Sequence, residues 1–223
     1  MNKDDEITSA AALVKLCAPE KLRPLLQSGC KGRLPERCSR QPTGPWMIQV
    51  VEYNSLWLAQ FEQIRRELSS NLIDLAIAIE HVGSTAVPGL AAKPVIDIDV
   101  VIESKERLES VIPRLGQLNY EYQGDLGIQN REAFRAPQGY APHHLYVCLQ
   151  GSTALRNHLV FRDHLRSDVA DRQAYASLKQ RLASHYPEDR NRYVQGKTEF
   201  VLRILSQHGF DDAELNAIRQ FSK

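Results

Sequence analysis

The sequence predicts an α+β fold: a mixed β-sheet with helices packed on one face, followed by a helical C-terminal part. Segments of alternating apolar residues, the pattern of half-buried strands, lie between residues 75 and 149. After Gly151 the apolar residues recur at helical spacing. Strands that come first and helices that come last favour this class over a doubly wound parallel sheet.

The apolar pattern also sets the order of the expected elements. Gly and Pro residues separate the strands, and a helix that begins after Gly151 opens the C-terminal part. The expected elements are a strand over 48–51, a helix with the stripe Trp57, Phe61, Ile64 and Leu68, strands over 75–79 and 96–102, a helix over 108–118, strands over 120–122, 132–136 and 144–149, and helices marked by Leu155, Leu159 and Leu165, by Tyr175, Leu178 and Leu182, and by Val201, Leu202 and Leu205.

The regular pattern also divides the chain. Residues 1–45 are expected to form an N-terminal extension with a short helix and a linker rich in Gly, Pro, Arg and Cys. Residues 46–210 form the main domain, and residues 211–223 are expected to be a C-terminal tail.

The composition excludes several classes of function. A net charge of +1 argues against a broadly basic surface, so we do not expect nucleic acid as a partner. Cys17, Cys30, Cys38 and Cys148 form no CxxC pair and show no zinc-ligand spacing, which indicates reduced thiols. The N-terminus lacks the apolar core of a signal peptide, and no apolar run is long enough to span a membrane. We therefore expect a cytoplasmic protein without membrane contact.

Two carboxylates lie in the middle of the apolar segment 96–102. Asp97 and Asp99 are two residues apart, so in a strand both side chains project from the same face, while Ile96, Ile98 and Val100 face the core. Two acids at this spacing repel unless a cation lies between them, and oxygen ligands favour Mg²⁺ or Mn²⁺. The pair therefore predicts a catalytic metal site, the alternative being the solvated face of an edge strand.

A possible phosphate-binding turn precedes the aspartates. Gly83, Ser84 and Thr85 follow a strand, and small side chains there let a phosphate approach the backbone N–H groups. Lys93, in the loop before the aspartates, could neutralise such a phosphate, and His81 could contact the ligand. The alternatives are an ordinary turn, a solvated lysine and a structural histidine.

Further candidates follow later in the chain. If Leu145, Val147 and Leu149 face the core, His144 faces the same side as the aspartates and could act in catalysis or bind the metal or a phosphate. Arg156 and Arg162 lie in an expected helix, and together with Arg131, Arg135 and Lys197 they could form a basic rim around an anionic ligand. A surface histidine and a solvated helix face are the alternatives.

Five segments of the chain carry longer motifs: IEHVGSTAVPGL (79–90), KPVIDIDV (93–100), GDLGI (124–128), HHLYV (143–147) and LRNHLVFRD (155–163). Together they resemble the GrpB family, a group of nucleotidyltransferase-fold proteins that are also found fused to dephospho-CoA kinase. The resemblance covers roughly residues 47–208 and implies a mixed sheet of the DNA polymerase beta type. It implies a triphosphate at Gly83 and Ser84 and a divalent metal at Asp97 and Asp99. Members of the wider superfamily carry a third carboxylate where this chain has His144.

Two functions are compatible with these residues. The first is a metal-dependent nucleotidyltransferase that moves a nucleotidyl group from an NTP to an acceptor. The second is a non-catalytic module that binds a nucleotide or a phosphorylated metabolite resembling CoA. A third, weaker alternative is a scaffold whose aspartates are solvated. The first two hypotheses predict a nucleotide or a phosphorylated small molecule as the partner.

Overall fold

The structure is a computed structural model that describes residues 47–221. The expected N-terminal extension, with Cys17, Cys30 and Cys38, lies outside the described residues. Cys148, the remaining cysteine, is a free and buried thiol. Within the described part of the chain, no helix combines the length and apolarity needed to cross a membrane.

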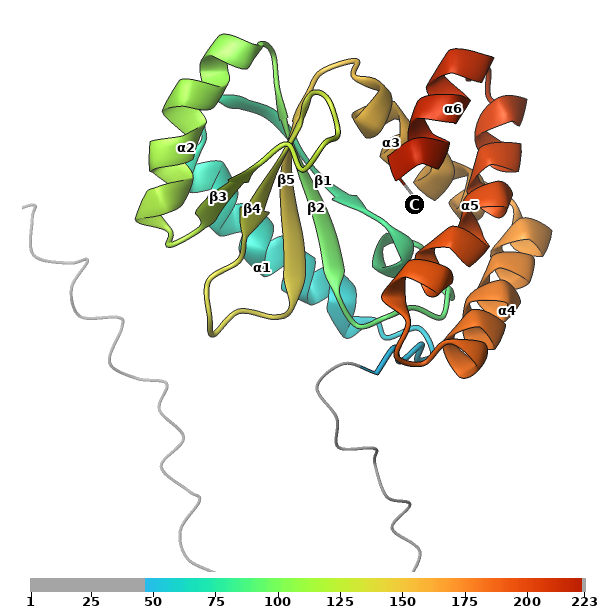
Figure 1. The fold of residues 1–223 in the computed structure, drawn as a ribbon. Coiled ribbons are helices and arrows are strands. Elements are labelled where there is room, and N and C mark those ends of the chain that lie inside the picture. Colours follow the sequence, from blue (N-terminus) through green and yellow to red (C-terminus); the bar gives the residue numbers. More distant parts are fainter. Residues whose placement is uncertain (1–46, 222–223) are drawn as a thin grey trace, which may run out of the picture. The chain divides into compact units, whose positions relative to one another are not determined.

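A five-stranded mixed sheet forms the centre of the structure, in the order β1-β2-β5-β4-β3 (Figure 1). β2 and β5 are parallel, and the other neighbouring strands are antiparallel. The order places β2, which carries both aspartates, in the interior of the sheet. The strands are β1 (Ala76–Val82), β2 (Ile96–Ile102), β3 (Glu121–Gly124), β4 (Arg131–Arg135) and β5 (His143–Leu149).

Two helices, α1 (Leu56–Asn71) and α2 (Leu108–Gln117), pack on one face of the sheet and form the main core with it. The predicted stripe of α1 is confirmed, because its four members are the buried residues of that helix. The inward side of β2 is also as predicted. Ile96, Ile98 and Val100 are almost completely buried in this core.

The helical C-terminal part covers the other face, where α3 (Thr153–Ser167), α4 (Val169–His185) and α5 (Arg190–Gln207) are grouped with α6 (Asp212–Phe221) on the right of the sheet in Figure 1. Helix α3 packs on the sheet through Leu155, which contacts a cluster containing Val101 and Cys148. Side-chain caps begin these three helices, because Ser152, Asp168 and Asp189 each accept a hydrogen bond from a backbone N–H in the first turn. The expected α+β class, with a helical C-terminal part, is therefore confirmed.

Two elements differ from the sequence-based prediction. Residues 48–51 contribute only an isolated bridge between Val51 and Ala92, not a strand. The expected tail contains a further helix, α6 (Asp212–Phe221). Asp211 and Glu214 begin this helix as a reciprocal pair, because each side chain accepts a hydrogen bond from the other's backbone N–H. The spacing Asp-x-x-Glu is a helix-start signal that could have been recognised in the sequence.

Candidate functional site

Asp97 and Asp99 lie on the sheet face that the C-terminal helices cover. Strand pairing places Asp97 beside His144 and Asp99 beside Tyr146 of β5. His144 therefore shares the aspartate face, as the alternation of β5 predicted, whereas His143 is buried and bonds Tyr120. At these positions of β5 the described chain offers an imidazole and a phenol, not a third carboxylate.

Gly83 lies directly against the Asp97 carboxylate. Its φ of +69° is in the region that favours glycine, and a Cβ at this position would be 2.1 Å from Asp97 Oδ2. On the other side of the carboxylate, His144 Nδ1 is 2.9 Å from Asp97 Oδ1. The Asp97 side chain is 31% exposed, so the turn and the imidazole position it at an open site.

Asp99 is completely buried, in contrast to Asp97. His158 Nδ1 of α3 lies 2.7 Å from Asp99 Oδ2, while Asp99 Oδ1 has no hydrogen-bond partner. Burial lowers the pKa of His158, but the Asp99 charge and this hydrogen bond outweigh it and raise the pKa above its usual value. A buried carboxylate oxygen without a partner is costly, and a bound cation would satisfy it. The two aspartates thus fit a divalent metal with oxygen ligands.

A cavity of 180 Å³ opens at Asp97; we call it the lysine cavity. Its walls come from the turn after β1, the start of β2, β5 and helices α4 and α5. Four cationic side chains surround one aspartate there. The lining residues are Ser84, Lys93, Val95, Asp97, His144, Lys179, Arg190, Tyr193, Val194 and Lys197.

Lys179 is the most constrained cation in the lysine cavity. It extends from α4, is 2% exposed, and donates hydrogen bonds to Ser84 Oγ at 2.8 Å and to the carbonyl of Ala91 at 2.5 Å. Burial, assisted by the charge of Lys197, lowers its pKa to about 7. The predicted Gly-Ser turn is therefore fixed to α4 through an amine that titrates near neutral pH.

Two other lysines of the cavity are also perturbed. Burial lowers the pKa of Lys197 to about 8, although Asp97 acts in the opposite direction. Burial and Arg190 lower the pKa of Lys93. Crowded, partly desolvated cations disfavour their own charge and therefore favour a bound polyanion. The lysine cavity has the charge expected of a phosphate-binding site.

Four of the predicted site residues neither line the lysine cavity nor pair with the aspartates: His81, Thr85, Arg156 and Arg162. His81 is buried, stacks on Phe61 and makes a hydrogen bond of 3.0 Å to Thr85 Oγ1, and burial lowers its pKa to about 4. Arg162 donates to Glu80 at 2.7 Å and to the carbonyl of His81. Arg156 donates to Glu214 of α6 at 2.6 Å. The structure thus brings together Asp97, Asp99, His144, Gly83, Ser84 and Lys93, but not these four.

Lys179 and Arg190 are cavity residues that the sequence analysis did not single out. For Lys179 a signal was present, because it lies four residues after Tyr175 on the expected apolar stripe of its helix. A lysine on an apolar stripe is unusual unless it has a partner. Arg190 gave no such signal, because it begins α5 after a turn.

A second cavity, of 450 Å³, lies beside His158; we call it the α6 cavity. It is bounded by the β3–β4 loop, the first half of α3 and helix α6. Its lining residues are Ile128, Gln129, Asn130, Arg131, Thr153, Ala154, Asn157, His158, Ala213, Glu214, Ala217 and Ile218.

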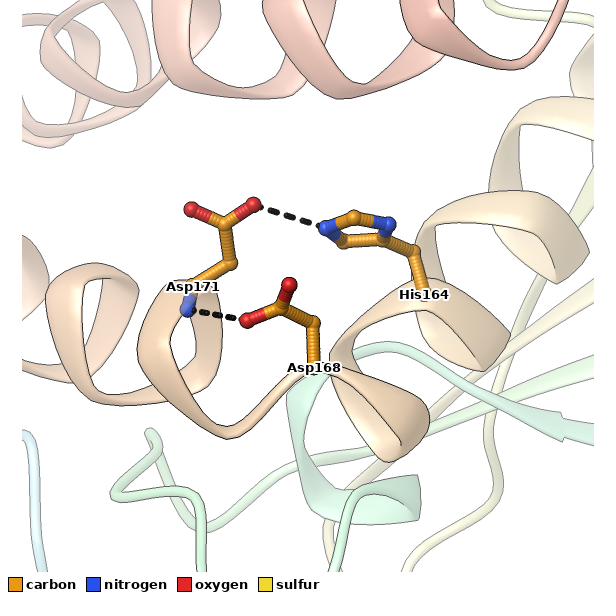
Figure 2. A group of neighbouring side chains, drawn as sticks. All are labelled: His164, Asp168 and Asp171. Atoms are coloured by element: carbon orange, nitrogen blue, oxygen red, sulfur yellow. Dashed lines mark hydrogen bonds and ion pairs between the residues drawn. The ribbon is translucent and has the colours of Figure 1, made fainter.

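Apart from the two cavities, His164, Asp168 and Asp171 form a cluster whose side chains are close enough together to hold a metal ion (Figure 2). The cluster already has internal partners: Asp168 caps α4, and Asp171 accepts hydrogen bonds of 2.7 Å from His164 and from Arg203 of α5. The guanidinium and the imidazole lower the pKa of Asp171. We assign this cluster a structural role, which is to join α3, α4 and α5.

Comparisons with known proteins place these features in context. The sequence profile described as GrpB protein matches residues 47–207. The UPF0157 protein YqkA of Bacillus subtilis is 34% identical over 154 residues, which are 69% of this chain but only 45% of that protein. The UPF0157 protein SCO7215 of Streptomyces coelicolor is 32% identical over 168 residues, 74% of this chain and 88% of that one. The crystal structure of conserved protein GrpB from Enterococcus faecalis aligns with a TM-score of 0.64 at 31% identity, covering 78% of this chain and 100% of that one.

Proposed function

This chain belongs to the GrpB family, and on that premise we propose that it transfers a nucleotidyl group from an NTP to an acceptor. The observation that carries the proposal is the aspartate pair of β2, whose first member, Asp97, lines a cavity together with four cations. Carboxylates beside clustered cations are the arrangement that phosphoryl chemistry requires, because the metal and the phosphates must be bound next to each other.

Asp97 and Asp99 are the proposed ligands of Mg²⁺ or Mn²⁺. When bound, such an ion supplies charge neutralisation on the transferring phosphoryl group. Asp99 Oδ1 is buried without a partner, and Asp97 is held in place by Gly83 and His144. His144 acts here as a positioning residue for Asp97.

The lysine cavity is the proposed site of the triphosphate. Ser84 begins a short helical turn, and its hydroxyl is fixed by Lys179. Lys93, Lys197 and Arg190 would balance the remaining negative charge. A bound triphosphate would also raise the pKa of each lysine, because it favours the charged amines.

The proposed reaction forms one bond and breaks one. A hydroxyl or amine of the acceptor attacks the α-phosphorus, and its proton is released to water. The bond between that phosphorus and the bridging oxygen breaks, and pyrophosphate leaves. Attack and departure take place on opposite sides of the phosphorus.

A second candidate function is binding without catalysis. The observation in its favour is the pairing of Asp97 and Asp99 with His144 and Tyr146, where a third carboxylate would be expected. In that case the lysine cavity would hold a nucleotide or another phosphorylated small molecule, with no need for a metal.

Transfer of label from each of the four α-³²P-NTPs, with Mg²⁺ and a pool of small alcohols, amines and hydroxy acids, separates the two functions. We expect label in a new product and release of pyrophosphate, with at least a 100-fold loss in Asp97→Asn. Asp163→Asn, which changes an exposed acid of α3, is the matched control. Equal transfer by wild type and Asp97→Asn would contradict the proposal. Metal-independent nucleotide binding without product would favour the second function.

A further inference from the structure

The α6 cavity has the size of a small-molecule site. Its volume of 450 Å³ is more than twice that of the lysine cavity and lies within the range of ligand pockets. Nothing in the proposed binding of metal and triphosphate uses it. Its wall includes His158, which also makes a hydrogen bond to the buried Asp99.

The two cavities lie toward opposite ends of the aspartate strand. The lysine cavity is lined by Val95 and Asp97, at the start of β2. The α6 cavity reaches Arg131, which pairs with Cys148 of β5, and Cys148 in turn pairs with Val101 of β2. The aspartate pair therefore lies between the cavities. If pyrophosphate leaves from the lysine cavity, the attacking group must approach from the other side, where the α6 cavity lies.

Arg131 is the one charged side chain of the α6 cavity without an opposite charge to neutralise it. Its guanidinium lies 4.4 Å from the centre of the Tyr146 ring, and its Nε is buried without a hydrogen-bond partner. Among the described residues, no carboxylate forms an ion pair with it. Glu214, the acid of this cavity, is already paired with Arg156 at 2.6 Å. A buried guanidinium donor without a partner indicates a ligand that supplies an acceptor.

The rest of the lining selects the kind of ligand. The apolar side chains match a small hydrocarbon body, and the amides of Gln129, Asn130 and Asn157 offer neutral hydrogen bonds. One unpaired cation balances a single negative charge, in contrast to the four cations of the lysine cavity. A monocarboxylate matches this charge and presents two oxygens to a guanidinium.

We propose that the α6 cavity binds a small monocarboxylic acid, with its carboxylate on Arg131 and its body against the apolar wall, and that this acid is the acceptor. The role as acceptor rests on the proposed function, whereas the binding of the acid does not. The acceptor's hydroxyl or amine would then face the aspartates past His158.

Ligand-observed NMR titration of the full chain tests this binding with isovalerate and benzoate as probes. We expect both acids to bind the wild type, and their amides, isovaleramide and benzamide, to bind at least tenfold more weakly. Arg131→Gln should weaken the binding of the acids at least tenfold. Ala217→Phe, which fills the cavity from α6, should do the same without removing a charge. Arg135→Gln, at the exposed end of β4, is the control and should bind as the wild type does.

Several results would overturn the inference. The first is that neither acid binds the wild type, and the second is that the acids and their amides bind equally. The third is that acid binding is unchanged in Ala217→Phe, or in an Arg131→Gln protein that circular dichroism shows to be folded. Inorganic phosphate that binds more tightly than the acids, with the same dependence on Arg131, would also overturn it. Titration of Mn²⁺ and NTP in the same samples keeps the two proposals separate. Acid binding without NTP binding would contradict the proposed function alone.

Discussion

The lysine cavity and the α6 cavity lie on either side of one aspartate pair but differ in charge. The lysine cavity crowds Lys93, Lys179, Lys197 and Arg190 into 180 Å³, and burial lowers the pKa of each of the three lysines. The α6 cavity has 450 Å³ and one unpaired guanidinium, on Arg131. If both cavities bind ligands as we propose, this difference predicts that the lysine cavity selects its ligand by charge and the α6 cavity selects its ligand by shape.

The two cavities also differ in the elements that form them. The lysine cavity combines the Gly-Ser turn and β2 with α4 and α5, all within the segment that matches the GrpB profile. One wall of the α6 cavity comes from α6, which begins at Asp212, beyond residue 207 where that match ends. The lysine cavity, our proposed phosphate site, is therefore built from the segment that matches the family, whereas the α6 cavity depends partly on sequence outside it.

The largest effect is expected from Gly83→Ala, which places a methyl group against Asp97. The new Cβ would lie 2.1 Å from Asp97 Oδ2, at a φ of +69°. We expect a loss of about 2–4 kcal/mol in the free energy of unfolding, measured in urea, and a loss of Mn²⁺ binding. The α6 cavity should still bind carboxylates in the fraction of protein that remains folded.

Gly89→Ala is the matched control for this change. Its φ of +78° is similar, but an added Cβ would meet no heavy atom within 4 Å. Gly89→Ala should therefore lower the free energy of unfolding by about 1 kcal/mol, through backbone strain alone, and should still bind Mn²⁺. Equal effects of the two substitutions would show that Gly83 is needed for its backbone conformation alone.

A pH-dependent effect of intermediate size is expected from Lys179. Its pKa is about 7 in the folded chain and near 10.5 when exposed. Between pH 7 and pH 10.5 the unfolded state therefore binds more protons than the folded state, and the free energy of unfolding rises with pH. The free energy of unfolding of the wild type, relative to Lys179→Met, should therefore rise by about 1–3 kcal/mol from pH 7 to pH 10. Lys105→Met, which removes an exposed lysine, is the control.

The same titration separates the two cavities by ligand affinity. Loss of protons from Lys179 and Lys197 should weaken triphosphate binding at least tenfold between pH 7 and pH 9.5. Binding of isovalerate should weaken less than triphosphate binding does, because Arg131 stays protonated and the charge of His158, the other titrating group of this wall, is balanced by Asp99. Isothermal titration calorimetry measures both affinities. Triphosphate affinity that is constant over this range would argue against the lysine cavity as its site.

The smallest effect is expected at His81, which lies outside both cavities. Its pKa is about 4 in the folded chain and near 6.5 when exposed, so the unfolded state binds more protons between these values. As the pH falls from 6.5 to 4, the free energy of unfolding of the wild type, measured in urea, should fall by about 1–2 kcal/mol relative to that of His81→Phe. NTP affinity at pH 7.5 should be unchanged in this variant. His185→Phe, at an exposed position, is the control.

Local patterns in the sequence were enough to predict the aspartate strand and its surroundings. Alternation placed Asp97, Asp99 and His144 on one face, because strand geometry requires it. The stripe of α1 was predicted for the same kind of reason, since its helical period is local. Gly83 was singled out as part of a turn, although its contact with Asp97 depends on the pairing of β1 with β2.

The rest of the site depends on tertiary contacts that a single sequence does not contain. Lys179 reaches Ser84 across 95 positions, and Arg156 reaches Glu214 across 58. Arg156 and Arg162 had the residue type and spacing of a basic rim, but their carboxylate partners come from α6 and β1. The spacing of charged residues in a helix therefore identified neighbouring arginines, but it could not show that Arg156 and Arg162 are paired with carboxylates of the chain itself.

The central claim is that Asp97 and Asp99 bind a divalent metal, and titration of Mn²⁺ tests it most directly. Electron paramagnetic resonance would follow the titration with and without an NTP, in the wild type, Asp97→Asn, Asp99→Asn and Asp163→Asn. The account predicts Mn²⁺ bound by the wild type and by Asp163→Asn, with affinity at least tenfold lower in both site variants. Mn²⁺ bound equally by all four proteins, or by none of them in the presence of NTP, would contradict it.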